Sequence, residues 1–159
     1  MALNHPLDTA SLSRLKKNPA ALIRTNKGNI KMQLLPLTAP GSVLNFITLA
    51  DDKFYDGKKI HRVVPNFVIQ GGCPRGDGYG SLDYTIRSEL PMEYYDQQGY
   101  VGMASAGNHT EGTQFFITHS PTPHLDGKYT IFGKVTEGME VVHDILVGDS
   151  IQQVSISYF

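Results

Sequence analysis

The sequence predicts a mainly β domain, either an antiparallel barrel or a sandwich, accompanied by two helices. Short extended runs separated by turn residues recur along most of the chain, with no regular alternation of strand and helix and no internal repeat. The 159 residues and a hydrophobic content of 40% suit one domain with one core. A closed barrel would also remove exposed strand edges, and two amphipathic helices would then cover its open ends.

The first part of the chain predicts a hairpin followed by a helix. Extended runs at residues 21–25 and 30–34 flank the polar, glycine-containing run 26–29, which is a hairpin signal. From Pro40 to Asp51 apolar residues recur at helical spacing, behind a proline that suits a helix entry. We expect one amphipathic helix there.

Six further strands and one helix are predicted in the rest of the chain. The runs 59–64 and 67–70 are separated by Pro65 and Asn66, a pair typical of turns. Residues 73–100 are rich in Gly, Asp, Tyr and Pro, so we expect long surface connections there. The remaining elements are strands at 100–104, 114–118, 130–135 and 154–158, a helix from about 139 to 146, and at most one extra short strand at 84–87.

The first 20 residues lack the patterning of the rest and are expected to form a linker or disordered lead, with the folded domain at residues 21–159. No basic region followed by an apolar core marks a secretion signal, and no apolar run approaches the roughly 20 residues that span a bilayer. We therefore expect a soluble chain with no membrane partner, cytoplasmic by default. The alternative is a domain excised from a larger, exported protein.

The charged residues are almost balanced, with 14 Lys and Arg against 15 Asp and Glu and a net charge of -1. Such a chain has no overall field that would attract nucleic acid or an anionic membrane surface, so we expect neither as a partner. A monomer that recognises its partner through a local site is the expectation. The single cysteine, Cys73, excludes an internal disulfide.

Three long motifs follow one another along the chain. They are FYDGKKIHRVVPNFVIQGG at 54–72, GMASAG at 102–107 with GTQFFI at 112–117, and HLDGKYTIFGKV at 124–135. Together they resemble the signature motifs of the cyclophilins, a family of peptidyl-prolyl cis-trans isomerases (EC 5.2.1.8). The resemblance extends over about residues 22–159, and the fairly short connection after residue 73 is similar to that of compact bacterial members.

The resemblance implies a closed eight-stranded antiparallel β-barrel capped by two α-helices, with a peptide groove on its outer face. It also implies rotation about X-Pro peptide bonds and assistance to protein folding, with proline-containing peptides and unfolded protein chains as partners. The catalytic residues that it implies are Arg62, Phe67 and Gln70. The substrate-binding residues that it implies are His61, Val68, Ala104, Ser105, Ala106, Gln114, Phe116, His124, Leu125 and Tyr129.

The chemistry of this reaction accounts for an arginine beside an apolar slot. Rotation about an X-Pro amide meets a barrier of roughly 18–20 kcal/mol, yet it breaks no bond. Catalysis therefore needs no nucleophile, metal or cofactor, only a site that binds the twisted amide more tightly than the planar one. Arg62 would donate to the prolyl nitrogen, whose lone pair is free in the twisted state, while Gln70 would hold the carbonyl side. Phe67, Phe116 and Leu125 would enclose the proline ring.

Three positions depart from well-known members of the family. His124 stands where several members carry tryptophan, Ser105 where asparagine is frequent, and Tyr129 where histidine is frequent. The missing tryptophan predicts weakened affinity for the inhibitor cyclosporin, because imidazole covers less apolar area than indole and costs more to desolvate. Catalysis should suffer much less, since the arginine and the proline slot are retained.

Other interpretations of these residues remain open or are less favoured. The alternative function is a proline-peptide binding module with little turnover, although a pure binder would not require a charged donor beside the prolyl nitrogen. His119 and His124 could suggest a metal pair, but no cysteine or carboxylate cluster stands nearby at zinc spacing, so no metal is expected. The glycine-rich run 76–80 has no suitable helix after it and lacks the Walker lysine, so we expect a flexible turn.

Overall fold

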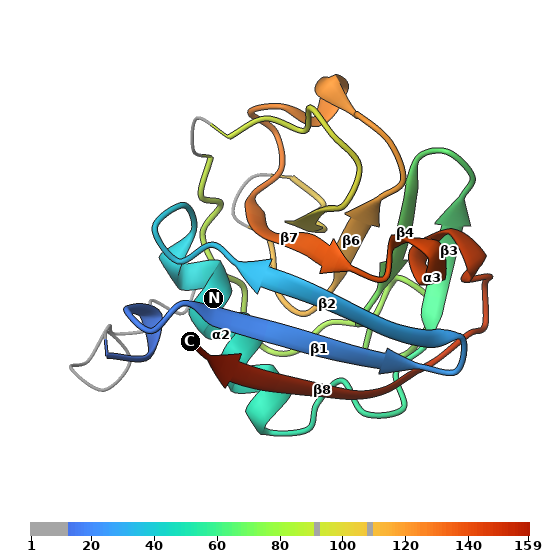
Figure 1. Ribbon diagram of the computed structural model, residues 1–159, viewed down its shortest axis with the longest axis horizontal. Helices are drawn as coiled ribbons and strands as arrows, with labels where there is room; N and C mark the ends of the chain where they lie inside the picture. Colours follow the sequence, from blue (N-terminus) through green and yellow to red (C-terminus); the bar gives the residue numbers. More distant parts are fainter. Residues whose placement is uncertain (1–12, 91–92, 108–109) are drawn as a thin grey trace.

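Eight strands in one antiparallel sheet dominate the structure, a computed structural model that describes residues 13–90, 93–107 and 110–159 (Figure 1). The strands are β1 (Pro19–Thr25), β2 (Gly28–Leu34), β3 (Ile60–Val64), β4 (Val68–Gly71), β5 (Tyr100–Met103), β6 (Phe115–Thr118), β7 (Ile131–Glu137) and β8 (Ile151–Tyr158). They are accompanied by α2 (Pro40–Asp51), α3 (Met139–Asp144) and a 3-10 turn, η1 (Pro123–Leu125). All eight predicted strands and both predicted helices are present, while the extra strand considered at 84–87 is reduced to an isolated bridge between Ile86 and Glu111.

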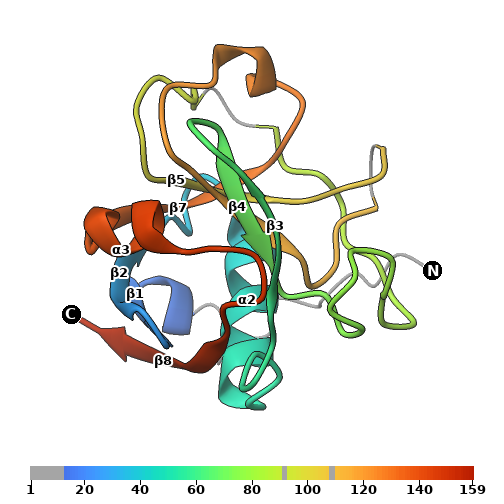
Figure 2. The same ribbon diagram turned by 90° about the vertical axis from the view of Figure 1, so that its right-hand side faces the viewer.

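The sheet has the strand order β3-β4-β6-β5-β7-β2-β1-β8 and curls into a half-barrel (Figure 2). Its two edge strands, β3 and β8, meet near their starts, where Lys59 forms an isolated bridge with Ser150 and Ile151 is hydrogen-bonded to the backbone of Gly57 and Lys58. On the other side of that bridge, the N–H of Ile60 donates to the carbonyl of Asp149, and the carbonyl of Ile60 accepts from the N–H of Gly148. Because antiparallel chains run in opposite directions, β3 continues beside the residues that precede β8 and not beside β8 itself. The eight antiparallel strands are therefore confirmed, but the predicted closure of the barrel is not.

The main hydrophobic core lies inside the curled sheet, where α2 packs. The ring of Phe46 on α2 meets the rings of Tyr55, Phe115 and Phe132 at centroid distances of 5.1, 5.7 and 5.3 Å. The shorter helix α3 packs against β2, so that the two helices lie toward opposite ends of the sheet in Figure 1. Within the described residues no helix is long and apolar enough to cross a membrane.

A second apolar cluster lies on the outer face of the sheet. Phe115 joins the main core whereas its neighbour Phe116 joins this outer cluster, as expected for successive residues of a strand. Its buried members are Val68, Tyr95, Phe116, Leu125 and Ile131, with Leu35, Phe67, Tyr100, Ala104 and Tyr129 packed against them. The outer cluster is the base on which a surface groove can form.

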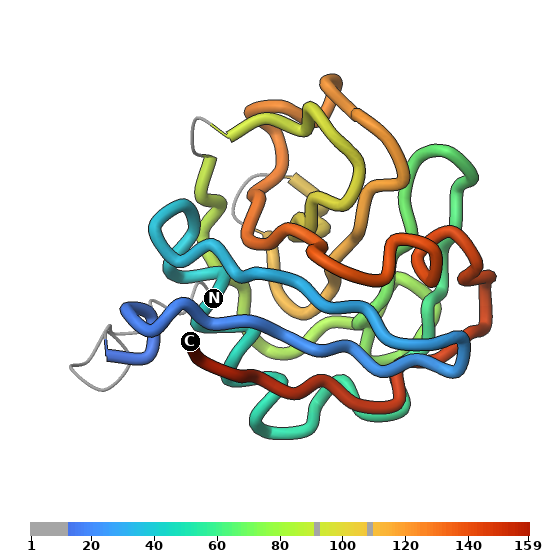
Figure 3. Tube along the Cα trace, viewed as in Figure 1, coloured from blue at the N-terminus to red at the C-terminus, as the bar shows by residue number. Residues whose placement is uncertain are grey.

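The long connection between β4 and β5, which Figure 3 traces over the surface, holds the start of α2. The residue before this helix, Ala39, offers no side chain to cap it. The carboxylate of Glu89 accepts hydrogen bonds from the N–H groups of Gly41 and Ser42 at 3.0 and 2.7 Å, and from the Ser42 hydroxyl at 2.8 Å. A carboxylate at a helix N-terminus accepts from N–H groups that have no partner within the helix. Its negative charge also interacts favourably with the positive end of the helix dipole.

The folded chain begins earlier than the predicted boundary at residue 21. Pro19 already pairs with Tyr158 of β8, and the N–H of Phe159 donates to the carbonyl of Lys17 at 3.0 Å. Leu15 is buried in the main core. Residues 13–20 were predicted to be part of a linker, but here they pack on the domain, and pairing with β8 lets β1 begin at Pro19. Residues 1–12 of the predicted linker lie outside the described residues.

Candidate active site

The predicted site residues converge on the outer face of the sheet, around the β3–β4 hairpin and the ends of β5 and β6. A cavity of about 200 Å³ opens there, and every residue that lines it was among the predicted ones. The lining residues are Arg62, Phe67, Val68, Gln70, Ala104, Ser105, Phe116, Leu125 and Tyr129. Sites for drug-sized ligands usually enclose roughly 300–1,000 Å³, so this cavity suits a single side chain.

The apolar walls of the cavity are supported from behind by Tyr95. Phe116 and Leu125 are buried, and the Phe116 ring meets the ring of Tyr129 edge to face at a centroid distance of 5.8 Å. Tyr95 stacks on Phe116 at 5.8 Å, and its hydroxyl donates toward the carbonyls of Tyr129 and Thr130 at 3.2 and 3.3 Å. Burial raises the pKa of Tyr95 far above its ordinary value, so the hydroxyl stays a donor. Sequence patterning missed Tyr95, because an irregular connection has no periodic signal.

Arg62 stands at the polar edge of the cavity. A register shift after Ile60 places Arg62, rather than His61, opposite Gln70. The Nη1 of Arg62 donates to Oε1 of Gln70 at 3.3 Å, and the guanidinium carbon lies 5.8 Å from the centroid of the Phe67 ring. The positive charge is therefore held beside an aromatic face at the entrance of the slot.

Two side-chain amides connect Arg62 to the glycine-rich loop. Nε2 of Gln70 donates to Oε1 of Gln114 at 3.1 Å. Nε2 of Gln114 in turn donates to the carbonyls of Gly78 and Gly80 at 3.0 and 3.3 Å. The run predicted to be a flexible turn is thus hydrogen-bonded to the site.

A second cavity of about 180 Å³ adjoins the first and shares Gln70, Ala104 and Ser105 with it. The predicted residues Ala106 and Gln114 lie in this second cavity. Sequence analysis did not assign its other lining residues, which are Gly78, Gly80, Ser81, Thr110, Gly112 and Thr113. These residues belong to the glycine-rich loop and to the connection before β6, where the motifs assigned only Ala106 and Gln114.

His61 and His124 flank the two cavities without lining either of them. His61 lies next to Gly78, and its pKa is lowered by burial and by the charge of Arg62, with Asp77 opposing the shift. His124 is exposed, and its ring lies against Phe67 with a centroid distance of 5.2 Å. Both histidines can therefore influence a bound peptide only at the rim.

The two histidines considered as a metal pair have different neighbours in the structure. His119 stacks on His143 at a centroid distance of 5.1 Å, and its Nε2 lies 3.3 Å from the carbonyl of Val142. His124 packs on Phe67 instead. In the part of the chain that the structure describes, no group of three or more His, Cys, Asp or Glu side chains could hold a metal ion.

Comparison with known proteins shows which family this chain resembles. The family model described as cyclophilin type peptidyl-prolyl cis-trans isomerase/CLD matches residues 20–157. Peptidyl-prolyl cis-trans isomerase B of Bacillus subtilis (strain 168) is 48% identical over 128 residues, covering 80% of this chain and 90% of that relative. A peptidyl-prolyl cis-trans isomerase of Helicobacter pylori (strain J99) is 45% identical over 148 residues, covering 90% of each chain.

Solved structures give the same result. A crystal structure of a Cryptosporidium parvum cyclophilin type peptidyl-prolyl cis-trans isomerase has a TM-score of 0.84 and 31% identity, covering 89% of this chain and 99% of that one. A second crystal structure of that protein, in the presence of the dipeptide Ala-Pro, has a TM-score of 0.82 and 32% identity, covering 88% and 99%.

Proposed function

This chain belongs to the cyclophilin-type peptidyl-prolyl cis-trans isomerase family, and we propose that it isomerises X-Pro bonds in the outer groove with Arg62 as its catalytic cation. The observation that carries the proposal is the position of the Arg62 guanidinium. It lies beside Phe67, hydrogen-bonded to Gln70, at the edge of an apolar cavity that suits one side chain. That arrangement sets a fixed cation against the nitrogen of a proline whose ring fills the cavity.

Rate acceleration follows from the difference between the planar and the twisted amide. As the C–N bond rotates, resonance is lost and the prolyl nitrogen becomes a hydrogen-bond acceptor. Arg62 donates to that nitrogen only in the twisted state, so the interaction lowers the barrier rather than merely tightening binding. One preorganised donor of this kind contributes about 2–4 kcal/mol, which corresponds to about 10²–10³ in rate.

The remaining predicted residues bind the substrate. Phe67, Phe116 and Leu125 enclose the proline ring, with Val68 and Tyr129 beside them, and Gln70 holds the carbonyl side of the rotating bond. The backbone around Ser105, just after β5, pairs with the extended peptide in the manner of an added strand. The substrates are proline-containing peptides and unfolded chains, a class supported by the structural relative solved in the presence of Ala-Pro.

Two further properties belong to the proposal. Cyclosporin is expected to bind weakly, because His124 is exposed at the rim and covers less apolar surface than a tryptophan there would. The chain is expected to act as a monomer that recognises its partner through this groove.

A protease-coupled assay on an Ala-Pro peptide separates this function from a proline-peptide binding module. An isomerase at substoichiometric concentration accelerates the slow phase, which reports cis-to-trans conversion of the peptide. A binder at the same concentration leaves that phase unchanged. An unchanged slow phase with the folded wild-type chain would exclude catalysis and favour the binding module.

A further inference from the structure

Two polar contacts, which we call anchors, restrain the glycine-rich loop from Cys73 to Gly80. The Gly80 N–H donates to the Sγ of Cys73 at 3.2 Å, and Cys73 is fully buried. The Tyr79 N–H donates to Oδ1 of Asp77 at 2.9 Å. Between these anchors Gly78 has a φ of 88°, a backbone conformation that residues with a side chain rarely adopt. The loop carbonyls therefore point in fixed directions.

Two of these carbonyls decide which way the amide of Gln114 points. The carbonyls of Gly78 and Gly80 can only accept, so they select the NH₂ end of Gln114, at 3.0 and 3.3 Å. The Oε1 of Gln114 must then face Gln70, from which it accepts a hydrogen bond at 3.1 Å. A flipped Gln114 amide would turn its oxygen toward two other acceptors and lose both bonds.

The same selection passes through Gln70 to Arg62. Because the NH₂ group of Gln70 donates to Gln114, its Oε1 faces Arg62 and accepts a hydrogen bond from Nη1 at 3.3 Å. A guanidinium can only donate, so this orientation of Gln70 is the one that serves both neighbours. One N–H of Arg62 is used in this bond, which restrains the guanidinium beside Phe67 and leaves its other donors for a substrate.

We propose that the loop 73–80 is a positioning element for Arg62, which it orients through the amides of Gln114 and Gln70. The proposal rests on the proposed catalytic function of Arg62. Cys73 and Asp77 line neither cavity, so they are positioning residues that act through the loop. Loosening either anchor lets the loop carbonyls turn, and the Gln114 amide then loses the partners that select its orientation.

NMR of side-chain amides tests the relay directly, without depending on turnover. Cys73→Ala removes the acceptor of the Gly80 N–H, and the NH₂ resonances of Gln114 and Gln70 should both move. The NH₂ group of Gln33, which donates to the Pro19 carbonyl at 3.0 Å in another part of the sheet, is the internal control and should stay in place. Unmoved Gln114 and Gln70 resonances in the folded variant would overturn the proposal.

A double-mutant cycle distinguishes positioning from general destabilisation. Cys73→Ala should lower kcat about 2- to 10-fold with KM nearly unchanged, the effect of one lost hydrogen bond on a catalytic group. In a Gln114→Ala background the same change should have almost no further effect, because its route to Arg62 is already cut. Equal losses in both backgrounds would overturn the relay, as would no loss in either.

Substitutions of Asp77 give a second test of the proposal. Asp77 is exposed, so we expect these variants to fold. Asp77→Ala removes the acceptor of the Tyr79 N–H and should lower kcat about 2- to 5-fold. Asp77→Asn keeps an oxygen acceptor without the charge and should restore both the rate and the Gln114 resonance. If Ala and Asn behave alike, the anchor is refuted. Unchanged turnover in Arg62→Ala would instead refute the proposed catalytic role of Arg62, while the amide resonances would still report on the relay.

Discussion

Arg62 lies directly opposite Gln70 across the β3–β4 ladder, one residue out of the register that begins with Ile60 opposite Gly71. Residues paired across an antiparallel ladder share a face of the sheet, and successive residues alternate between faces. Without the register shift Arg62 would lie opposite Ile69, whose side chain belongs to the main core. One extra residue in β3 thus directs the guanidinium into the groove rather than toward the core.

Replacing Arg62 should abolish most of the rate acceleration while keeping the fold. Arg62 is exposed, so Arg62→Ala should change the free energy of unfolding by no more than about 0.5 kcal/mol. Turnover of an Ala-Pro peptide should fall by about 10²–10³, because the donor to the twisted amide is gone. Arg62→Lys keeps the charge but not the planar fork, and we expect an intermediate rate. A folded Arg62→Ala variant with nearly wild-type turnover would remove Arg62 from the mechanism.

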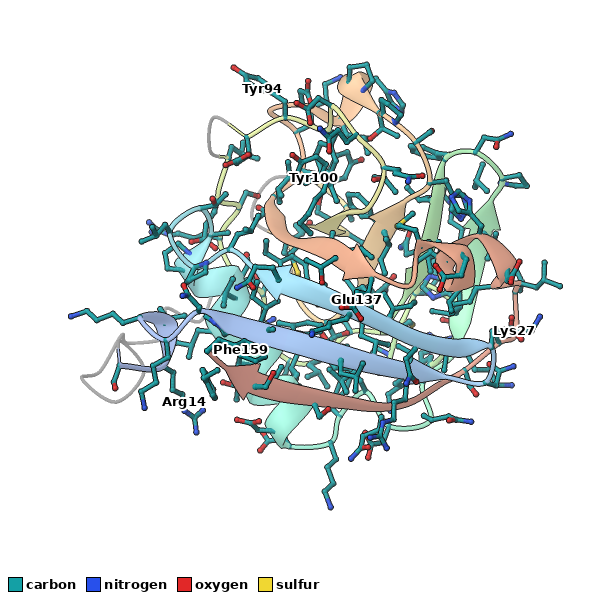
Figure 4. All side chains as sticks on the ribbon, in the orientation of Figure 1. Arg14, Lys27, Tyr94, Tyr100, Glu137 and Phe159 are labelled. Atoms are coloured by element: carbon teal, nitrogen blue, oxygen red, sulfur yellow. The ribbon has the colours of Figure 1, made fainter. Side chains whose placement is uncertain are left out.

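Removing the hydroxyl of Tyr95 should destabilise the wall of the 200 Å³ cavity. Tyr95→Phe keeps the ring that stacks on Phe116 but leaves the carbonyls of Tyr129 and Thr130 without this donor. We expect a loss of about 1–3 kcal/mol in the free energy of unfolding, measured by urea titration, and a raised KM for proline peptides. The matched control is Tyr94→Phe, since Tyr94 points outward at the upper edge of Figure 4 and is 52% exposed. Equal effects of the two changes would contradict this role of Tyr95.

The stability of the protein should fall as the pH drops below about 6.5. Burial lowers the pKa of His119 below its ordinary value of 6.5, the Val142 carbonyl opposes the shift, and the stacked ring of His143 lowers it further. The unfolded chain therefore takes up the proton more readily than the folded one. The contribution of His119 to stability is complete above the unfolded pKa and is lost as the pH falls through the lower, folded pKa.

Urea titrations at pH 7.5 and 5.5 measure this loss. In His119→Gln the difference between the two pH values should be smaller than in the wild type. It should not vanish, because the lowered pKa of His61 acts in the same direction. Asp77 and Asp149, whose pKa values lie below 3.8, titrate outside this window. A pH dependence that is identical in wild type and His119→Gln would exclude His119 as its source.

Substituting His124 should change inhibitor binding far more than catalysis. The exposed imidazole lies against Phe67 at the rim, and an indole there would cover more apolar surface and add one N–H donor. His124→Trp should tighten cyclosporin binding by about 1–3 kcal/mol, as measured by titration during turnover, while peptide turnover changes little. Wild-type affinity equal to that of the variant would mean that the indole contributes little in this groove.

Local patterning predicted the elements of this protein well and their connections poorly. The helix Pro40–Asp51 was predicted with its observed bounds, because apolar spacing and an entry proline are properties of the segment itself. The bond from Glu89 to the start of that helix was not predicted, since it joins residues more than 40 positions apart. The glycine-rich run 76–80 was expected to be a flexible turn, because nothing local indicates that Cys73 and Gln114 bind it.

The sequence by itself determined the family, the eight strands and the side chains that line the 200 Å³ cavity, because motifs and the alternation of apolar residues are local properties of the chain. Only the tertiary structure decided that the barrel ladder stays open between β3 and β8, that a register shift turns Arg62 toward Gln70, and that Tyr95 supports Phe116 from behind. Each of these depends on which distant segments meet and in what register. Those quantities follow from the packing of the whole sheet, and no local pattern of residue types specifies them.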